Sequence, residues 1–305
     1  MNWFLIALGA PVLWALVNIS DQYLIAKYSK SEQGSGALVL FSSLIGIITA
    51  FLIAVFIPNV FQVPLGDRLL LAFTGVLTIG WVILYFRALS VEDVSAVVPW
   101  FLTIPIFGYI LGYVFLGETL TPYQLIGSII VMIGAVILSI DFSGSQKNIF
   151  KWKVLKYMIP ACLMASVIGV IFKYVTVVDN FWVSSFWEYI GLGITGVVIY
   201  FGVKTYRKDF LEMLRNGGRI IISLNISSET FTVIGNLLTN YAVLLAPVAI
   251  VYLVASFQPA VVLILTLLGT RFFPHIVTED TSFRTLLPKV VAILFMVLGS
   301  TVLFL

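Results

Sequence analysis

The stretch from Ala88 to Ile140 reads ALSVEDVSAVVPWFLTIPIFGYILGYVFLGETLTPYQLIGSIIVMIGAVILSI. It contains two apolar segments, Ser95 to Leu116 and Pro122 to Ile140, joined by a short polar turn. At about 1.5 Å of rise per residue, a helix of roughly 20 residues crosses the ~30 Å hydrocarbon core of a bilayer. Both segments are therefore predicted to span a membrane.

The turn between these segments carries the signals that start a helix. Thr121 is suited to cap the second helix, Pro122 to occupy its first position, and Gln124 to complete a capping box with Thr121. The second segment is therefore predicted to begin at Pro122.

A similar pattern returns near the C-terminus, where Ala242 to Leu268 is followed by Leu287 to Leu305. The proline in the middle of the first segment, Pro105, corresponds to Pro259 in the later copy. Such an echo is a weak sign of an internal repeat, and it predicts two related halves.

The composition agrees with a multi-spanning membrane protein. Of the 305 residues, 61% are hydrophobic and 10% are charged, and the mean hydropathy is +1.10. No soluble domain of this length needs that much apolar surface. Cys162 is the only cysteine and His275 the only histidine, so a disulfide, a metal cluster or a Ser/His/Asp centre has almost no raw material. We expect no cofactor, no metal and no nucleic acid.

The predicted fold is an all-α integral membrane protein with ten transmembrane helices in two inverted five-helix repeats. Five spans per half is an odd number, so the second half must enter the membrane in the opposite sense to the first. The repeats are assigned to residues 1–140 and 154–305, joined by a polar linker at 141–153. The ten spans are expected near residues 3–26, 36–57, 69–89, 95–116, 122–140, 154–176, 182–203, 219–244, 248–269 and 286–305.

Polar residues inside the eighth span form the strongest functional pattern. Asn225, Glu229, Thr232, Asn236 and Asn240 recur at steps of three or four residues, so they share one helix face. A charge at the bilayer centre costs about 2.5 to 3.5 kcal/mol on insertion scales, so this face is expected to meet a wet interior. The pattern predicts a polar cavity in which Glu229 binds substrate.

Other spans carry shorter polar stripes, and each has a structural alternative. Asparagine and threonine side chains in a membrane often only bridge two helices, at about 0.6 kcal/mol on average. Asp21 can extend to the membrane surface, and Lys173 can lie at that surface or form a structural pair with Glu229. The further candidates on these stripes are Trp14 and Asn18 in the first span, Trp81 in the third, Glu188 in the seventh, and Tyr252 and Ser256 in the ninth.

The opening stretch resembles the hallmark of the EamA family in the drug/metabolite transporter superfamily. The matching features are Ala88-Leu89, Pro105, Leu116-Gly117-Glu118, Gln124, Gly127 and Gly134. The second half departs from this pattern, since Thr270, Arg271 and Phe272 stand where the first half has Leu-Gly-Glu.

The resemblance implies two inverted repeats around a central cavity lined mainly by spans one, three, four, six, eight and nine. It makes Glu188 less central than its own stripe indicates. The cavity roles that it implies fall on Trp14, Asn18, Trp81, Pro99, Lys173, Glu229, Asn236, Tyr252 and Ser256.

Two observations give opposite orientations of the termini. The odd-numbered loops hold most of the lysines and arginines, and the positive-inside rule then places both termini outside. The family resemblance implies that both lie in the cytoplasm.

Together these patterns predict a multi-pass secondary transporter of the cell (inner) membrane rather than an enzyme. The expected substrate is a small organic metabolite such as an amine, an amino acid or a drug-like solute, moved outward, with Glu229 or Asp21 exchanging a proton. The alternatives are an exchanger of anionic or phosphorylated metabolites, with Lys173 and Arg87 as the anion site, and a membrane enzyme acting on lipid-linked substrates. Protons, membrane lipids and a second copy of the chain, as a homodimer, are the further candidate partners.

Overall fold

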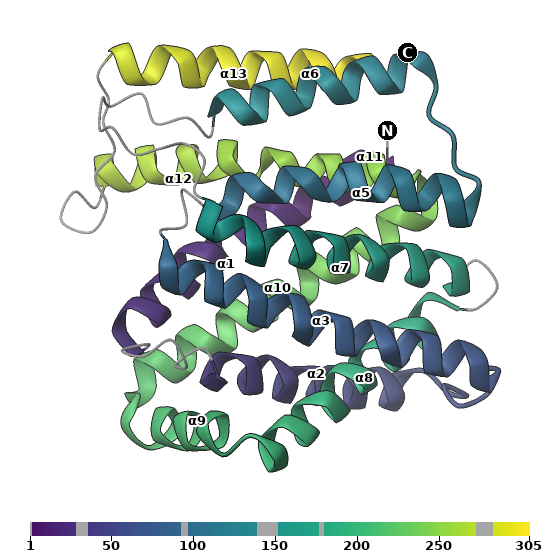
Figure 1. The fold of residues 1–305 in the computed structure, drawn as a ribbon, viewed down its shortest axis with the longest axis vertical. Coiled ribbons are helices and arrows are strands. Elements are labelled where there is room, and N and C mark those ends of the chain that lie inside the picture. Colours follow the sequence, from purple (N-terminus) through teal and green to yellow (C-terminus); the bar gives the residue numbers. More distant parts are fainter. Residues whose placement is uncertain (1, 29–35, 93–96, 139–151, 177–179, 273–282) are drawn as a thin grey trace.

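The structure of the chain is a computed structural model, and it describes residues 2–28, 36–92, 97–138, 152–176, 180–272 and 283–305. Every regular element in these ranges is helical. The predicted linker at 141–153 lies almost wholly outside them, as does His275. The long helices run side by side, and both chain ends lie at the same edge of the molecule, on the right of the view (Figure 1).

The first half of the chain forms α1 (Asn2–Tyr28), α2 (Gly36–Phe56), α3 (Leu65–Val91), η1 (Val98–Thr103), α5 (Ile104–Leu111), η2 (Gly112–Leu116) and α6 (Pro122–Leu138). The second half forms α7 (Trp152–Thr176), α8 (Phe181–Gly202), α9 (Lys204–Asn216), α10 (Gly218–Leu245), α11 (Val248–Val254), η3 (Ala255–Phe257), α12 (Gln258–Phe272) and α13 (Phe283–Val302).

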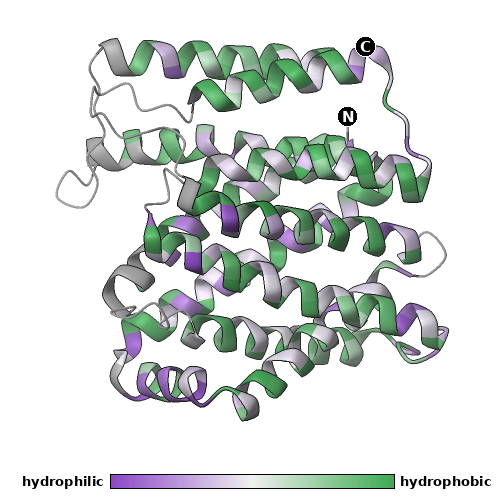
Figure 2. Ribbon diagram, viewed as in Figure 1, coloured by the Kyte–Doolittle hydropathy of each residue, from purple (hydrophilic) through white to green (hydrophobic). Residues whose placement is uncertain are grey.

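These helices are those of a multi-pass membrane protein. Among the described residues, 7 helices are long and apolar enough to cross a bilayer, and shorter apolar helices cover Trp100–Leu116, Pro122–Ile137 and Leu286–Val302. Apolar residues dominate the ribbon, while polar residues gather at helix ends and on α9 (Figure 2). Large apolar side chains such as Phe51 and Phe115, which are 66% and 65% exposed, lie on the outer surface, where lipid would cover them.

Two of the predicted spans are segmented rather than continuous. The span expected near residues 95–116 consists of η1, α5 and η2, and the span near 248–269 consists of α11, η3 and α12. Proline lies in the first turn of η1 and of α5, and Pro259 is the second residue of α12. Because proline lacks an amide donor, it breaks the i to i−4 hydrogen-bond pattern and allows these changes of helix type.

The polar turn before α6 has the predicted geometry. The Thr121 amide donates to Gln124 Oε1 at 2.9 Å, and the Gln124 amide donates to Thr121 Oγ1 at 3.2 Å. The capping box is therefore confirmed, and α6 begins at Pro122. Gly117 ends η2 with a φ of 66°, a left-handed conformation that glycine adopts at low cost.

Helices from the two halves pack against one another. α1 lies along α10, α3 along α7, α2 against α8, α5 against α11, and α6 against α13. α3 also packs on α8, and glycine makes this contact close: a Cβ atom on Gly191 would stand 2.0 Å from the Ala72 carbonyl oxygen, and one on Gly75 would stand 2.1 Å from the Leu192 amide nitrogen.

The loop expected between the seventh and eighth spans contains a helix, α9. Its apolar residues Tyr206, Phe210 and Met213 follow helical spacing, and all three pack into the core cluster that includes residues of α2. The ring centroids of Phe41 and Phe210 are 6.5 Å apart. Sequence reading took the lysines and arginines of this segment as a loop signal and missed its short apolar face.

Candidate functional site

A cavity of about 180 Å³ lies between the two halves of the bundle. Its lining comes from α1, α2, α3, η1, α5, α7, α8, α10, α11, η3 and α12, so it includes every predicted span that the family resemblance placed there, together with α2 and α8. An engineered apolar cavity of about 150 Å³ admits a molecule of the size of benzene, so this one has room for a small organic solute. The polar lining residues are Asn18, Asp21, Ser42, Thr78, Glu188, Glu229, Thr232, Asn236, Thr239, Asn240 and Gln258.

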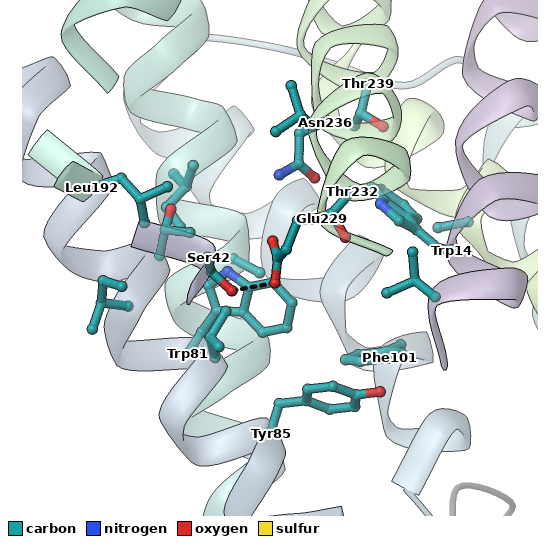
Figure 3. Close-up of a pocket in the computed structure, with 18 of the residues that line it drawn as sticks. Trp14, Ser42, Trp81, Tyr85, Phe101, Leu192, Glu229, Thr232, Asn236 and Thr239 are labelled. Atoms are coloured by element: carbon teal, nitrogen blue, oxygen red, sulfur yellow. Dashed lines mark hydrogen bonds between the residues drawn. The ribbon is translucent and has the colours of Figure 1, made fainter. Parts of the chain in front are cut away.

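Glu229 lines this cavity, with Ser42, Trp81 and Thr232 near it (Figure 3). Its side chain extends from α10 towards α2, and the figure marks the hydrogen bond between its Oε1 atom and the Ser42 hydroxyl. The same Ser42 hydroxyl lies 3.1 Å from the Leu38 carbonyl oxygen. The single Ser42 proton can go to either acceptor, so both contacts are hydrogen bonds only when Glu229 carries a proton and donates to the serine oxygen.

Asp21 lies at the same level of α10 as Glu229. Its Oδ1 atom accepts a hydrogen bond from Ser228 at 3.4 Å, and Ser228 precedes Glu229 in the chain. One turn earlier on α1, Asn18 accepts a hydrogen bond from the Tyr85 hydroxyl at 3.0 Å. The Asn18 Nδ2 atom has no hydrogen-bond partner among the described residues, so a donor is available there. α1 and α10 thus bring two carboxyl groups and a free amide to one wall.

Glu188 enters the cavity from α8 at a different level. Asn240 Nδ2 donates to Glu188 Oε2 at 2.8 Å, and the Glu188 side chain is buried. Asn240 was predicted on the same polar stripe as Glu229, and it reaches the cavity at the far end of that stripe. The resemblance made Glu188 less central than its own stripe indicated, and the seventh span nevertheless contributes this acidic group to the lining.

Aromatic rings form much of the remaining wall. Trp14, Trp81, Tyr85 and Phe101 lie around the Glu229 carboxylate (Figure 3). The ring centroids are 6.0 Å apart for Trp81 and Tyr85 and 5.7 Å for Tyr85 and Phe101. Ring faces carry a negative quadrupole and attract cations. The aromatic wall and the carboxylates therefore both favour a positively charged ligand.

Tyr252 also lines the cavity, and its position depends on a glycine in α7. The Tyr252 hydroxyl donates to the Ala165 carbonyl at 3.0 Å. A Cβ atom on Gly169 would stand 2.0 Å from that hydroxyl oxygen, so only glycine leaves room for the ring. A glycine of α7 thus makes room for a tyrosine of α11.

The structure brings seven of the ten predicted site residues to the cavity wall and places two elsewhere, while the side chain of Pro99 lies outside the described part of the chain. The seven are Trp14, Asn18, Asp21, Trp81, Glu229, Asn236 and Tyr252. Ser256 is buried in η3 outside the lining.

Lys173 is the second residue that lies away from the cavity lining, and it pairs with Glu118 rather than with Glu229. Its ammonium contacts a Glu118 carboxylate oxygen at 2.5 Å and donates to the Ala246 carbonyl at 2.8 Å. The lysine is near the end of α7, where these acceptors come from the turn before α6 and the junction of α10 with α11. The expectation that Lys173 faces the substrate does not fit this geometry.

Several lining residues lay outside the predicted set. Ser42 is one of three hydroxyl residues of α2, with Ser43 and Thr49, and nothing in the sequence distinguishes it from the other two. Glu188 did lie on a recognised polar stripe. Among the described lining residues there are three carboxyl groups and no lysine, arginine or histidine, and no group of His, Cys, Asp or Glu in the described residues could hold a metal ion.

The helices and the cavity together define a multi-pass membrane protein with room for a small solute between its two halves. The model of the EamA-like transporter family matches residues 1–140, which confirms the predicted family over that part of the chain. A crystal structure of another protein is similar over 99% of this chain and 95% of its own, with a TM-score of 0.63 and 15% sequence identity. At that identity the likeness concerns the fold. No curated protein matches the sequence.

Proposed function

We propose that this protein is a secondary transporter that exports a small organic amine across the cell (inner) membrane in exchange for protons. The observation that carries the proposal is the cavity itself, in which Asp21, Glu188 and Glu229 lie among aromatic rings without a basic residue in the described lining. A buried carboxylate is costly unless a proton or a cation neutralises it. An ammonium group would supply that charge.

The contacts between the two halves support the proposed inverted repeat and a rocking mechanism of transport. In two repeats of five spans, the counterparts of α1 and α10 are α7 and α3. Exchanging the halves converts the α1 to α10 contact into the α7 to α3 contact, and both are extensive. The contacts of α2 with α8, α5 with α11 and α6 with α13 map onto themselves. Such symmetry lets the repeats alternate roles about a site between them.

The surroundings of Glu229 can accommodate either protonation state. When Glu229 is ionised, the Ser42 hydroxyl can donate to the carboxylate. When Glu229 is neutral, its own proton can go to the Ser42 oxygen while the serine donates to the Leu38 carbonyl at 3.1 Å. A group that is hydrogen-bonded in both states can release a proton as an ammonium arrives and recover it when the ammonium leaves.

The alternative of anion exchange has less support. Arg87 does not line the cavity, and the Lys173 ammonium is already paired with Glu118. An anionic substrate would then meet three carboxyl groups with no described counter-charge. We therefore favour amines over phosphorylated metabolites.

Transport in proteoliposomes with an imposed pH gradient tests the proposal. A radiolabelled monoamine should be driven by the gradient in the wild type, and Glu229→Gln should abolish the dependence on the gradient. Glu212→Gln is a matched control, because Glu212 lies on α9 away from the cavity. Gradient-driven transport that persists in Glu229→Gln would refute the assignment of proton exchange to this residue.

A further inference from the structure

The three carboxyl groups of the cavity gather at two levels. Asp21 and Glu229 form one level, since Asp21 contacts the residue next to Glu229. Glu188 forms the other through its hydrogen bond to Asn240. Glu229 and Asn240 are eleven positions apart on the continuous helix α10, which at 1.5 Å per residue is about 16 Å along its axis. We name these levels the Glu229 pole and the Glu188 pole.

Each pole is hydrogen-bonded to neutral groups only in the contacts that the structure gives. The donors are the Ser42 hydroxyl to Glu229, the Ser228 hydroxyl to Asp21 and the Asn240 amide to Glu188. One ammonium at the Glu229 pole would leave the Glu188 pole, about 16 Å away along α10, without a compensating cation. Each pole can therefore bind one ammonium group.

The wall between the poles suits a hydrocarbon chain with occasional polar contacts. Val233 offers apolar surface on α10, and Thr232, Asn236 and Thr239 extend the polar face of the same helix from one pole to the other. A methylene chain would gain affinity with each CH₂ group that it buries against this wall. A long, narrow molecule with charged ends would use the whole cavity.

We propose that the preferred substrate is a linear organic dication, a diamine or polyamine, whose terminal ammonium groups lie at the Glu229 pole and the Glu188 pole. If each ammonium lies about 3 Å inside its carboxylate along the axis, the two nitrogens are about 10 Å apart. This inference rests on the proposed amine transport and adds a second site, Glu188, with a length requirement. An amino acid bound through its ammonium group at the Glu229 pole would direct its own carboxylate towards Glu188, and the two negative charges would repel each other.

Isothermal titration calorimetry on the purified full-length protein tests the length requirement. The ligands are diaminobutane, diaminooctane and diaminododecane, with octylamine as the monocation of matched chain length. Diaminooctane should bind at least about 10-fold more tightly than octylamine or diaminobutane, because only it pairs with both carboxylates. The preference for diaminooctane over octylamine should disappear in Glu188→Gln and persist in the control Glu212→Gln, because Glu212 lies on α9 outside the cavity lining.

A second variant keeps the test informative if Glu188→Gln is unstable. Glu188→Asp withdraws the carboxylate by one methylene, so the preferred diamine should become longer. Equal affinity of the wild type for all diamines and for octylamine would overturn the inference and leave amine transport intact. If neither octylamine nor any diamine binds, the proposed function fails as well.

Discussion

The Lys173 ammonium lies 2.5 Å from one carboxylate oxygen of Glu118, and the other oxygen of that carboxylate accepts a hydrogen bond from the Val248 amide at 2.9 Å. These contacts join the turn before α6 to the end of α7 and to the first residue of α11. They also occupy the one lysine that the sequence placed inside a span near the site. Pairing at the end of the bundle thus preserves the acidic character of the cavity.

Breaking this pair should destabilise the protein. Lys173→Met leaves Glu118 largely buried without its cation, and removing one partner of a buried ion pair typically costs about 3 to 5 kcal/mol. Lys208→Gln is the comparison, because Lys208 and Glu212 form an exposed pair with a separation of 3.8 Å, and such pairs contribute about 1 kcal/mol or less. Thermal unfolding in detergent should show a large loss for the first variant only. Equal effects would contradict a structural role for the Lys173 pair.

Enlarging Gly191 should separate α3 from α8. The added methyl group in Gly191→Ala would stand 2.0 Å from the Ala72 carbonyl oxygen, a backbone atom that cannot turn away. Overpacking of this kind costs about 1 to 3 kcal/mol or more. Gly66→Ala in α3 is the control, since no atom lies within 4 Å of the added methyl group. Its melting temperature should be unchanged or slightly higher, whereas that of Gly191→Ala should fall.

Local sequence signals were sufficient for some features of this fold. The capping box of Thr121 and Gln124 involves residues three apart, so both partners can be read from one turn of sequence. The polar face of α10 was also local, and Glu229, Asn236 and Asn240 do line the cavity. On the same face, Asn225 instead donates to the Ile221 carbonyl at 3.0 Å and lies outside the lining. Periodicity identifies a helix face, and the neighbouring helices decide which part of it is wet.

Contacts between distant segments could not be read from periodicity. The partner of Lys173 is Glu118, in a turn of the other half of the chain, and the partner of Glu229 is Ser42 in α2. The helix α9 was not predicted for a related reason. Its few apolar residues stand among charged ones, and the contact with α2 that buries them cannot be read from the sequence. Such pairings depend on how the helices assemble.

The aromatic wall should contribute to amine binding. Trp81→Leu removes a ring that lies beside Glu229, and a cation–π contact is worth about 0.5 to 2 kcal/mol. We expect octylamine affinity to fall by about 2- to 30-fold, a range that follows from those energies. Trp182→Leu is the control, since Trp182 is 43% exposed and does not line the cavity. Similar affinities for the two variants would argue against a role for the Trp81 ring.

Asp209 on α9 should make stability depend on pH. Burial and the nearby Glu212 carboxylate raise the pKa of Asp209 above its usual value of 3.8, against the opposing effect of the Lys208 ammonium. A raised pKa in the folded state means that ionisation destabilises it, so this cost is present at neutral pH and disappears as the pH falls below 3.8. Asp209→Asn should raise the melting temperature slightly at pH 7, and its advantage should shrink on acidification. A gain that grows at low pH would contradict this sign.

The most direct test of the central claim is the number of protons released when the protein binds an amine. Titrating octylamine into the protein by calorimetry, in two buffers with different heats of ionisation, gives that number. Exchange at Glu229 predicts proton release by the wild type, none by Glu229→Gln, and unchanged release by the control Glu212→Gln. Equal release by the wild type and Glu229→Gln, or binding without any release, would contradict the account.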